Sequence, residues 1–311
     1  MALVVAVPES VPAREAALRL LYSRLPPEQC REQTAETLSA AQRGELALDH
    51  LLMALEEDRV IGALLGVERP GGAAFLWPPV VCEGTDSEAA ATALLEALGR
   101  RFDERGVRFA QCLLEPDDAA GRDALQRGGF PCVTDLLLMA RPAGAPASTG
   151  PLPALAVECY RDALRETFSQ IVERTYQGTL DCPVLARIRS GEDSLDAHRA
   201  TGEFDPDGWR LYRAEGKVVG VLLLAAHPER RAWEIAYLGV VPEARGHRIG
   251  RAILCDGLLL ADRSAWSAEI AVDVANTPAL RLYRGLGFLE LRRFSVHLRL
   301  NAADQRARKD S

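Results

Sequence analysis

The sequence predicts an α/β protein built from two tandem domains of similar plan. Its 311 residues are enough for two ordinary domains, and 48% of them are hydrophobic, which allows a sizeable core. Apolar runs of strand length alternate with longer helical segments. A stretch rich in Pro, Gly, Ala and Ser separates two halves with the same order of elements. We therefore expect an N-terminal domain over residues 1–142, a linker over 143–153, a C-terminal domain over 154–303 and a polar tail over 304–311.

The first half begins its regular pattern with apolar strands and continues with alternating helices and strands. Turn residues separate each apolar run from the next. In chain order the pattern predicts strands at 48–55, 59–68 and within 73–82, a helix at 87–102, a strand at 108–115, a helix ending near 130 and a strand at 133–140.

The second half repeats this plan. A hairpin around Glu215-Gly216 joins strands at 208–216 and 217–226. It is followed by a strand at 233–241, a helix at 249–263, a strand at 268–274, a helix at 277–288 and a strand at 294–300. Aligning "GGF" (128–130) with "LGF" (286–288) gives an offset of 158 residues, and the same offset pairs the preceding strand and helix without gaps. This favours an internal duplication of one α/β unit over a coincidence between two unrelated domains.

The charge of the chain argues against some classes of ligand and favours others. The net charge of −7 argues against general nucleic-acid binding. Residues 1–150 carry 14 basic and 22 acidic side chains, whereas residues 151–311 carry 23 basic and 22 acidic side chains. An anionic ligand therefore meets less repulsion in the second half.

Seven scattered cysteines form no CxxC pair and the histidines have no metal-type spacing, which predicts reduced thiols and no metal site. With neither a signal peptide nor a long apolar run, we expect a cytoplasmic protein, monomeric or homodimeric, that binds neither membrane nor nucleic acid.

The segment "VVPEARGHRIGRAIL" (240–254) carries the strongest functional signal. It places Arg245, Gly246, His247, Arg248 and Gly250 between an apolar strand and an apolar helix. The first N–H groups of a helix have no partner within the helix and the helix dipole favours negative charge, so this junction predicts a phosphate site. The alternative is an ordinary turn with a solvated basic face.

The surroundings of this loop resemble the GNAT superfamily of acyl-CoA-dependent N-acyltransferases. That family combines a Val-x-Pro strand end with Gln/Arg-x-x-Gly-x-Gly/Ala, which here corresponds to Val240-Val241-Pro242 followed by Arg245 to Gly250, with Arg248 where glycine is usual. The later "VDVANTPALRLYRGLGF" matches its Asn and Tyr followed by Gly-Phe. The resemblance covers roughly 155–301 and implies a mixed, mostly antiparallel sheet flanked by helices in each domain. The tandem arrangement is similar to the mycothiol synthase group.

The resemblance implies acetyl-CoA as co-substrate and a primary amine of a small molecule as acceptor. Acetyl transfer needs a neutral amine, a stabilised oxyanion and a protonated leaving thiolate. We expect Glu234, between apolar Trp233 and Ile235, to act as general base with a raised pKa, and Tyr283 to be the general acid. The residues expected to contact acetyl-CoA are Leu238, Gly239, Val240, Arg245, Gly246, His247, Arg248, Ile249, Gly250, Arg251 and Asn276.

Several alternatives stay open. Cys182 and Cys255 allow a covalent acyl-cysteine route, although cysteine in apolar surroundings is commonly inert. A non-catalytic acyl-CoA sensor and an acetyltransferase for protein or peptide N-termini are rival functions. The first domain is expected to lack a CoA site, because its equivalent loop offers Glu83, Asp86 and Glu88 in place of arginines and Leu125 stands at the offset position of Tyr283.

Overall fold

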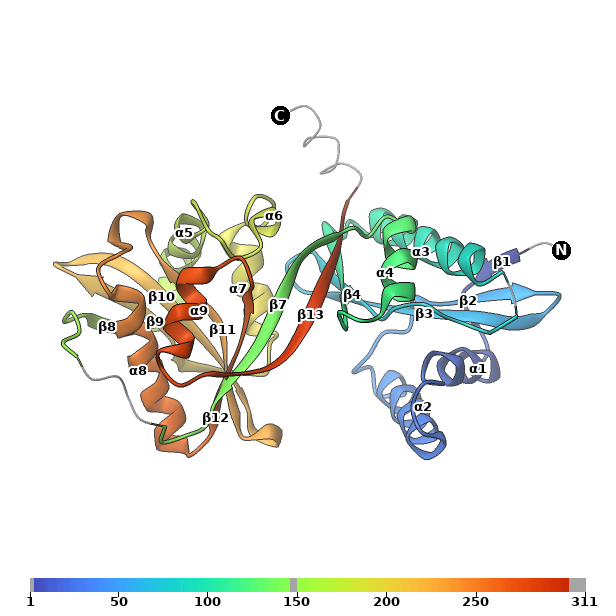
Figure 1. Cartoon of the computed structure of the whole chain (residues 1–311), viewed down its shortest axis with the longest axis horizontal. Coiled ribbons are helices and arrows are strands. Elements are labelled where there is room, and N and C mark those ends of the chain that lie inside the picture. Colours follow the sequence, from blue (N-terminus) through green and yellow to red (C-terminus); the bar gives the residue numbers. More distant parts are fainter. Residues whose placement is uncertain (1–2, 85, 146–149, 302–311) are drawn as a thin grey trace, which may run out of the picture. The chain divides into compact units, whose positions relative to one another are not determined.

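The protein is described here from a computed structural model that covers residues 3–84, 86–145 and 150–301 (Figure 1). These residues form two compact units. The first unit runs to Val133 and resumes at Ser295, and the second runs from Thr134 to Phe294. The expected tail at 304–311 and residues 146–149 of the expected linker lie outside the described residues.

The first unit is a sheet in the order β1-β2-β3-β4-β6-β13, with antiparallel neighbours except for parallel β4 and β6. Its elements are β1 Leu3–Ala6, α1 Val11–Leu21, α2 Pro27–Gln42, β2 Leu51–Glu56, β3 Arg59–Arg69, β4 Ala73–Leu76, β5 Val80–Val81, α3 Ser87–Glu104, β6 Phe109–Leu114, α4 Ala119–Arg127 and the end of β13 Leu289–Leu300. The expected apolar run at 73–82 is interrupted by Pro78-Pro79, because proline has no N–H for a sheet.

The second unit is a sheet in the order β7-β12-β11-β10-β9-β8, in which only β11 and β12 are parallel neighbours. The mixed, mostly antiparallel sheet flanked by helices is thereby confirmed for both domains. The elements are β7 Cys132–Arg141, β8 Ala156–Cys159, η1 Asp162–Leu164, α5 Arg165–Thr175, α6 Pro183–Ala186, α7 Gly191–Arg199, β9 Glu203–Ala214, β10 Lys217–His227, η2 Pro228–Arg230, β11 Ala232–Val240, η3 Pro242–Ala244, α8 Ile249–Ser264, β12 Ser267–Asp273 and α9 Thr277–Arg284.

The two units exchange their last strands. The 158-residue offset makes β7 the equivalent of β13 and β6 the equivalent of β12. However, β7 pairs with β12, from Leu136 with Asp273 to Arg141 with Ala268. In turn, β13 pairs with β6, from Ser295 with Leu114 to Leu300 with Phe109. The compact units therefore divide the chain at 133/134 and 294/295, not within the proline-rich stretch that the sequence indicated as the boundary.

Helices α5 and α8 cover opposite faces of the second sheet. A Cβ built on Gly220 of β10 would lie 2.4 Å from Ile253 of α8, which shows how closely α8 packs on that face. On the other face, a Cβ on Gly239 of β11 would lie 2.6 Å from Thr175 Oγ1 at the end of α5. Gly239 pairs with Val221, the neighbour of Gly220, and successive strand residues point to opposite faces. Glycines at both positions allow the helices to approach the central strands.

Helices α1, α2 and α7 are additions to the elements that the apolar pattern predicted. The sequence of α2, "PEQCREQTAETLSAAQ", is mostly polar, and its buried residues are two threonines. Its apolar stripe is therefore too weak to be recognised by periodicity. Among the described residues, no helix is long and apolar enough to cross a membrane.

Candidate active site

The site begins where β11 and β12 separate. These parallel strands pair only from Ala232 with Ser267 to Glu234 with Glu269. On its other side β11 pairs with β10, where a register shift leaves Ala236 as an extra residue between Ile235 and Tyr237. Such a bulge bends a strand and increases its twist. Beyond Glu234 the edge of β11 that faces β12 is therefore left without a strand partner.

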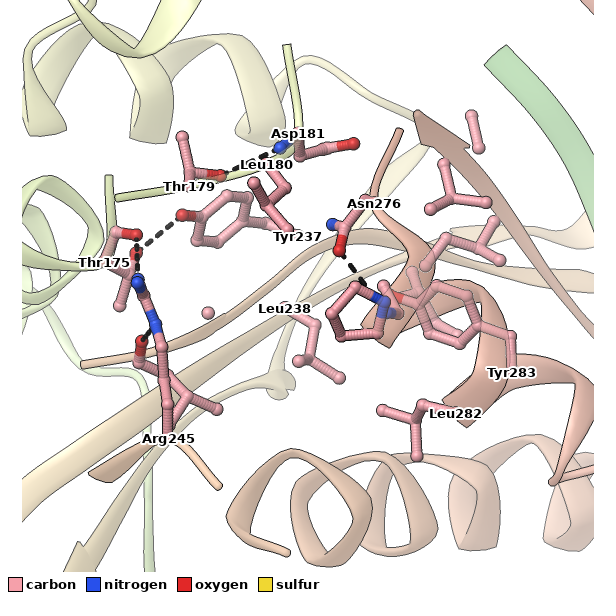
Figure 2. A pocket seen from close by; sticks show the side chains of 18 of the residues that line it. Thr175, Thr179, Leu180, Asp181, Tyr237, Leu238, Arg245, Asn276, Leu282 and Tyr283 are labelled. Carbon is pink, nitrogen blue, oxygen red and sulfur yellow. Dashed lines mark hydrogen bonds between the residues drawn. The ribbon is translucent and has the colours of Figure 1, made fainter. Parts of the chain in front are cut away.

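A cavity of about 230 Å³ fills the opening between the two strands (Figure 2). We call it the cleft cavity. Its walls come from β11, β12, the start of α9 and the loop after α5. The lining residues are Thr175, Gly178, Thr179, Leu180, Asp181, Ile235, Ala236, Tyr237, Leu238, Gly239, Val240, Arg245, Ile270, Ala271, Val272, Asn276, Pro278, Ala279, Leu282 and Tyr283.

A second cavity, of about 820 Å³, lies at the beginning of α8, and we call it the loop cavity. It shares seven lining residues with the cleft cavity, including Leu238, Val240 and Asn276. All its charged lining residues are arginines: Arg245, Arg248, Arg251 and Arg281. A volume of this size with one sign of charge is suited to a large anionic ligand.

The N-terminus of α8 leaves its N–H groups available to such a ligand. Its N-cap residue is Arg248, and no side chain caps the first turn. Arg248 adopts the left-handed conformation, with φ of 61°. Glycine tolerates this conformation best, which explains why the family usually has glycine there and why Arg248 is a strained substitution.

Arg245 has a structural task that the sequence did not reveal. We expected its side chain to contact the anion. In the structure its guanidinium donates to the carbonyl oxygens of Thr175 and Gln177 at 2.8 Å, of Val240 at 3.1 Å and of Gly178 at 3.3 Å. Because the last carbonyls of a helix have no partner within it, Arg245 stabilises the end of α5 and ties it to β11.

The remaining loop residues differ in what they offer. Gly246 has φ of 82°, and His247 and Arg248 are exposed. Ile249 is only 6% exposed, so its side chain belongs to the core and only its backbone faces the loop. A Cβ on Gly250 would lie 3.6 Å from Val240 and 3.7 Å from Leu282, both lining the loop cavity. Gly250 thus keeps open space that any side chain would occupy.

Asn276 and Tyr283 come together on α9, as the resemblance implied. Asn276 caps the helix, with its Oδ1 accepting from the Ala279 N–H at 3.3 Å, and it lines both cavities. Tyr283 is 5% exposed and lines the cleft cavity. Burial, and secondly the charge of Asp181, raise the pKa of Tyr283 well above its usual value. Its hydroxyl is therefore protonated near neutral pH.

Glu234 lies away from these residues. It lines neither cavity, because the cleft cavity starts at the next residue of β11. Its Oε2 is 2.9 Å from His227 Nε2 and 3.7 Å from Arg230, which also lies 3.2 Å from Glu269. At the closed end of the β11–β12 pair, Glu234 belongs to a charged cluster. The expectation of a general base at this position is not supported by that geometry.

The structure adds a third cavity of about 170 Å³, which we call the side cavity. It shares Thr179, Asp181, Ala236 and Tyr237 with the cleft cavity. Its other lining residues are Tyr176, Cys182, Leu185, Ala186, Arg189 and His198. In the "TYQGTLDCP" loop, we singled out Cys182 from the sequence but not the neighbouring Asp181. An isolated carboxylate in a loop forms no sequence motif that would mark it as functional.

The cysteines are poorly suited to nucleophilic attack. Burial raises the pKa of Cys182 to about 11, and burial also raises the pKa of Cys255. Since the thiolate is the nucleophile, both side chains are thiols near neutral pH. Among the described residues, no group of three or more His, Cys, Asp or Glu is placed to hold a metal ion.

Comparisons with known proteins identify the family of the chain. Residues 172–288 match the model of the "Acetyltransferase (GNAT) family". A mycothiol acetyltransferase from Thermomonospora curvata is 30% identical over 250 residues, covering 76% of this chain and 78% of that protein. The match to the enzyme of the same name from Streptomyces griseus is 37% identical but spans only 31% of this chain and 32% of that protein.

A solved structure supports the fold of the whole chain. The GCN5-related N-acetyltransferase from Sphaerobacter thermophilus has a TM-score of 0.61 and covers 96% of this chain and 95% of its own, at 18% sequence identity. That identity is too low to carry the substrate over. Together with the long match to the Thermomonospora relative, these findings show that the chain belongs to the GNAT acetyltransferase family, as an acyl-CoA N-acyltransferase with two tandem GNAT domains.

Proposed function

We propose that the second unit transfers an acetyl group from acetyl-CoA to the primary amine of a small molecule, directly and within a ternary complex. The observation that carries this proposal is that two cavities adjoin and share lining residues. The arginine-lined loop cavity at the uncapped start of α8 shares residues with the cleft cavity, where Tyr283 lies. The loop cavity suits a diphosphate, and the cleft cavity, with Tyr283 as a proton donor, suits the acetyl transfer.

In this proposal the CoA diphosphate occupies the loop cavity. Backbone N–H groups from Gly246 to Gly250 bind its oxygens, and Arg248 and Arg251 add charge-assisted hydrogen bonds. The pantetheine arm then runs along the unpaired edge of β11, where an extended amide chain can accept and donate hydrogen bonds as a neighbouring strand would. The thioester lies near Leu238, Gly239 and Val240, and a backbone N–H there stabilises the oxyanion.

The transfer follows from the groups around the cleft cavity. A neutral amine attacks the thioester carbon, the new C–N bond forms, and the C–S bond breaks as the oxyanion collapses. Tyr283 donates its hydroxyl proton to the departing thiolate and regains a proton from the attacked nitrogen. The high pKa of Cys182 supports direct transfer, because an acyl-cysteine intermediate would need a thiolate.

The acceptor is inferred from the relatives. Because the Thermomonospora and Streptomyces proteins are named mycothiol acetyltransferases, the amine precursor of mycothiol is the first acceptor to test. The side cavity, which is small and opens beside the cleft cavity, favours a small molecule over a protein N-terminus. A screen for CoA release with this precursor, simpler cysteinyl conjugates, amino sugars and aminoglycosides identifies the acceptor class.

Replacing Gly250 with valine is the decisive binding test. The valine side chain would project toward Val240 and Leu282 and narrow the loop cavity at the start of α8. We expect wild-type protein to bind acetyl-CoA in calorimetry with micromolar affinity that weakens as salt rises, because charged contacts contribute. Gly250→Val should abolish binding, and Gly250→Ala, which adds only a Cβ in ordinary van der Waals contact, should weaken it less.

Leu259→Val is the matched control, since it places valine at an exposed position of the same helix. Its acetyl-CoA affinity should equal that of wild type, and thermal unfolding should confirm that all variants fold. Unchanged binding by folded Gly250→Val would refute the assignment of the loop cavity to CoA. Binding without CoA release for any amine in the screen would favour a sensor instead of an enzyme.

A further inference from the structure

Asp181 is the acidic residue that the cleft and side cavities have in common. Among the residues lining the three cavities described above, it alone carries a carboxylate. It lies in the loop between α5 and α6, and Figure 2 shows it around the same cavity as Tyr237, Asn276 and Tyr283. An acceptor that passes from the side cavity to the thioester must therefore pass this carboxylate.

The carboxylate of Asp181 is held in place through one of its oxygens. Much of the residue is open to solvent, but its Oδ1 turns inward and accepts from the N–H of buried Asp273 at 2.9 Å. Its own N–H donates to Thr179 Oγ1 at 3.1 Å. Within the described part of the chain, Oδ2 has no hydrogen-bond partner and no ion pair includes Asp181. One oxygen thus fixes the group while the other is available.

The neighbouring carboxylate of Asp273 has a different role. Its Oδ1 accepts from Thr134 Oγ1 at 2.7 Å and from the Ala275 N–H at 2.8 Å, and its Oδ2 accepts from the Cys182 N–H at 3.0 Å. Asp273 is 1% exposed, and these bonds satisfy both oxygens of its buried carboxyl group. Of the two carboxylates, Asp181 is the one that faces the cavities.

The surroundings of Asp181 favour a proton acceptor. Partial removal of water from its carboxylate raises the pKa of Asp181 above its usual value. The hydrogen bond from the Asp273 N–H opposes this shift, and the Asp273 carboxylate adds to it. Burial lowers the pKa of His198 in the side cavity to about 3, so that imidazole stays neutral and supplies no compensating charge. The titratable and charged groups that face Asp181 from the surrounding elements are Cys182, Asp273, Tyr237, Tyr283, Arg189 and His198.

We propose that Oδ2 of Asp181 binds the ammonium group of the acceptor and takes one of its protons, which makes Asp181 the catalytic base of the acetyl transfer. This inference rests on the proposed function. The ammonium loses a proton to Asp181, directly or through one water, and becomes the neutral amine that attacks the thioester. The second proton, on the attacked nitrogen, returns to Tyr283 after the tyrosine has protonated the thiolate. Asp181 then releases its proton to solvent.

The test is the pH dependence of kcat/KM for the best amine of the screen. In wild type, kcat/KM should fall as pH decreases through the pKa of Asp181, because only the carboxylate accepts a proton. Asp181→Asn keeps an oxygen for the Asp273 N–H but cannot accept the proton. We expect it to lower kcat/KM at neutral pH on the order of 10²-fold or more, and to approach wild type at high pH, where free amine is abundant. Acetyl-CoA affinity should not change.

Three further variants make the result specific. Asp207→Asn, on an exposed carboxylate of β9, should match wild type. Asp181→Glu should recover part of kcat/KM, and the decrease of its kcat/KM at low pH should occur at a different pH. This variant also tests the proposal if Asp181→Asn folds poorly. Glu234→Gln should keep the wild-type profile. The inference would be overturned if the decrease of kcat/KM at low pH disappeared in Glu234→Gln but persisted in Asp181→Asn. It would also be overturned if both Asp181 variants lost activity only in proportion to their loss of folded protein.

The outcomes separate this inference from the proposed function. If wild type binds acetyl-CoA and releases CoA with an amine, but Asp181→Asn retains the wild-type rate and pH profile, only the assignment of Asp181 fails. If wild type neither binds acetyl-CoA nor releases CoA with any amine of the screen, both fail.

Discussion

At the scale of the residue, neighbours decide what a side chain can do. Tyr283 and Arg245 both lie at positions that the family resemblance singled out. Tyr283 is buried beside the cleft cavity, where the loss of water keeps its hydroxyl protonated. Arg245 instead gives its donors to backbone carbonyls at the end of α5. The motif identified both positions, but only the three-dimensional contacts distinguish a candidate acid from a structural arginine.

Tyr283→Phe should lower kcat on the order of 10²-fold, because it removes a positioned proton donor. It preserves the ring, whose centroid lies 5.7 Å from that of Phe288. Steady-state kinetics at saturating acetyl-CoA measure this loss. Since burial raises the pKa of Tyr283, its ionisation should not limit wild-type activity until strongly alkaline pH. Tyr22→Phe, which removes a hydroxyl bonded to Thr37 in the first unit, is the control. A Tyr283→Phe rate close to wild type would exclude the tyrosine as the acid.

At the scale of the element, the starts of α8 and α3 differ in the features that favour an anion. The two helices occupy equivalent places in the duplication. Asp86 caps α3, with its Oδ1 accepting from the Ala89 N–H at 3.1 Å, and Glu88 lies in the first turn. The N–H groups that would bind a phosphate are thus partly used, and two carboxylates repel it. Helix α8 has neither a side-chain cap nor an acidic residue in its first turn.

We therefore expect one acetyl-CoA per chain. Calorimetric titration of the full chain measures the stoichiometry directly, and Gly250→Val should remove all of the binding. The absence of a tyrosine at the equivalent helix position, where Leu125 is fully buried, adds to the expectation that the first unit has no acetyl-transfer site. A stoichiometry near two, or residual binding in folded Gly250→Val, would show that α3 binds CoA despite its cap.

At the scale of the whole molecule, strand exchange makes each unit depend on a strand from the other half of the sequence. The edge of β12 is completed by β7, which precedes the proline-rich stretch, and the edge of β6 is completed by β13. Arg141 at the end of β7 is 1% exposed and lies 2.9 Å from the partly exposed Asp262 of α8, so β7 supplies the buried arginine of an ion pair in the second unit. Removing β7 would leave that sheet edge unpaired and would remove the arginine that pairs with Asp262.

Two fragments of similar length test this dependence. We expect residues 134–294, which keep β7, to unfold cooperatively and to bind acetyl-CoA. Residues 154–303, the domain that the sequence indicated, lack β7 and should aggregate or melt without a cooperative transition. Circular dichroism on heating and acetyl-CoA calorimetry distinguish them. A stable, CoA-binding 154–303 fragment would show that the exchange is dispensable.

The sequence by itself determined the class of the fold, the duplication and the position of the glycine- and arginine-rich loop before α8. These features depend on local pattern: apolar periodicity defines strands and helices, glycines and arginines mark the start of α8, and Asn276 and Tyr283 follow at a fixed spacing. Tertiary structure alone decided which strand completes which sheet, that Glu234 pairs with His227 away from the cavities, and that Asp181 faces them. The physical reason is that strand pairing and side-chain surroundings join residues far apart in the chain, and local sequence carries no record of those contacts.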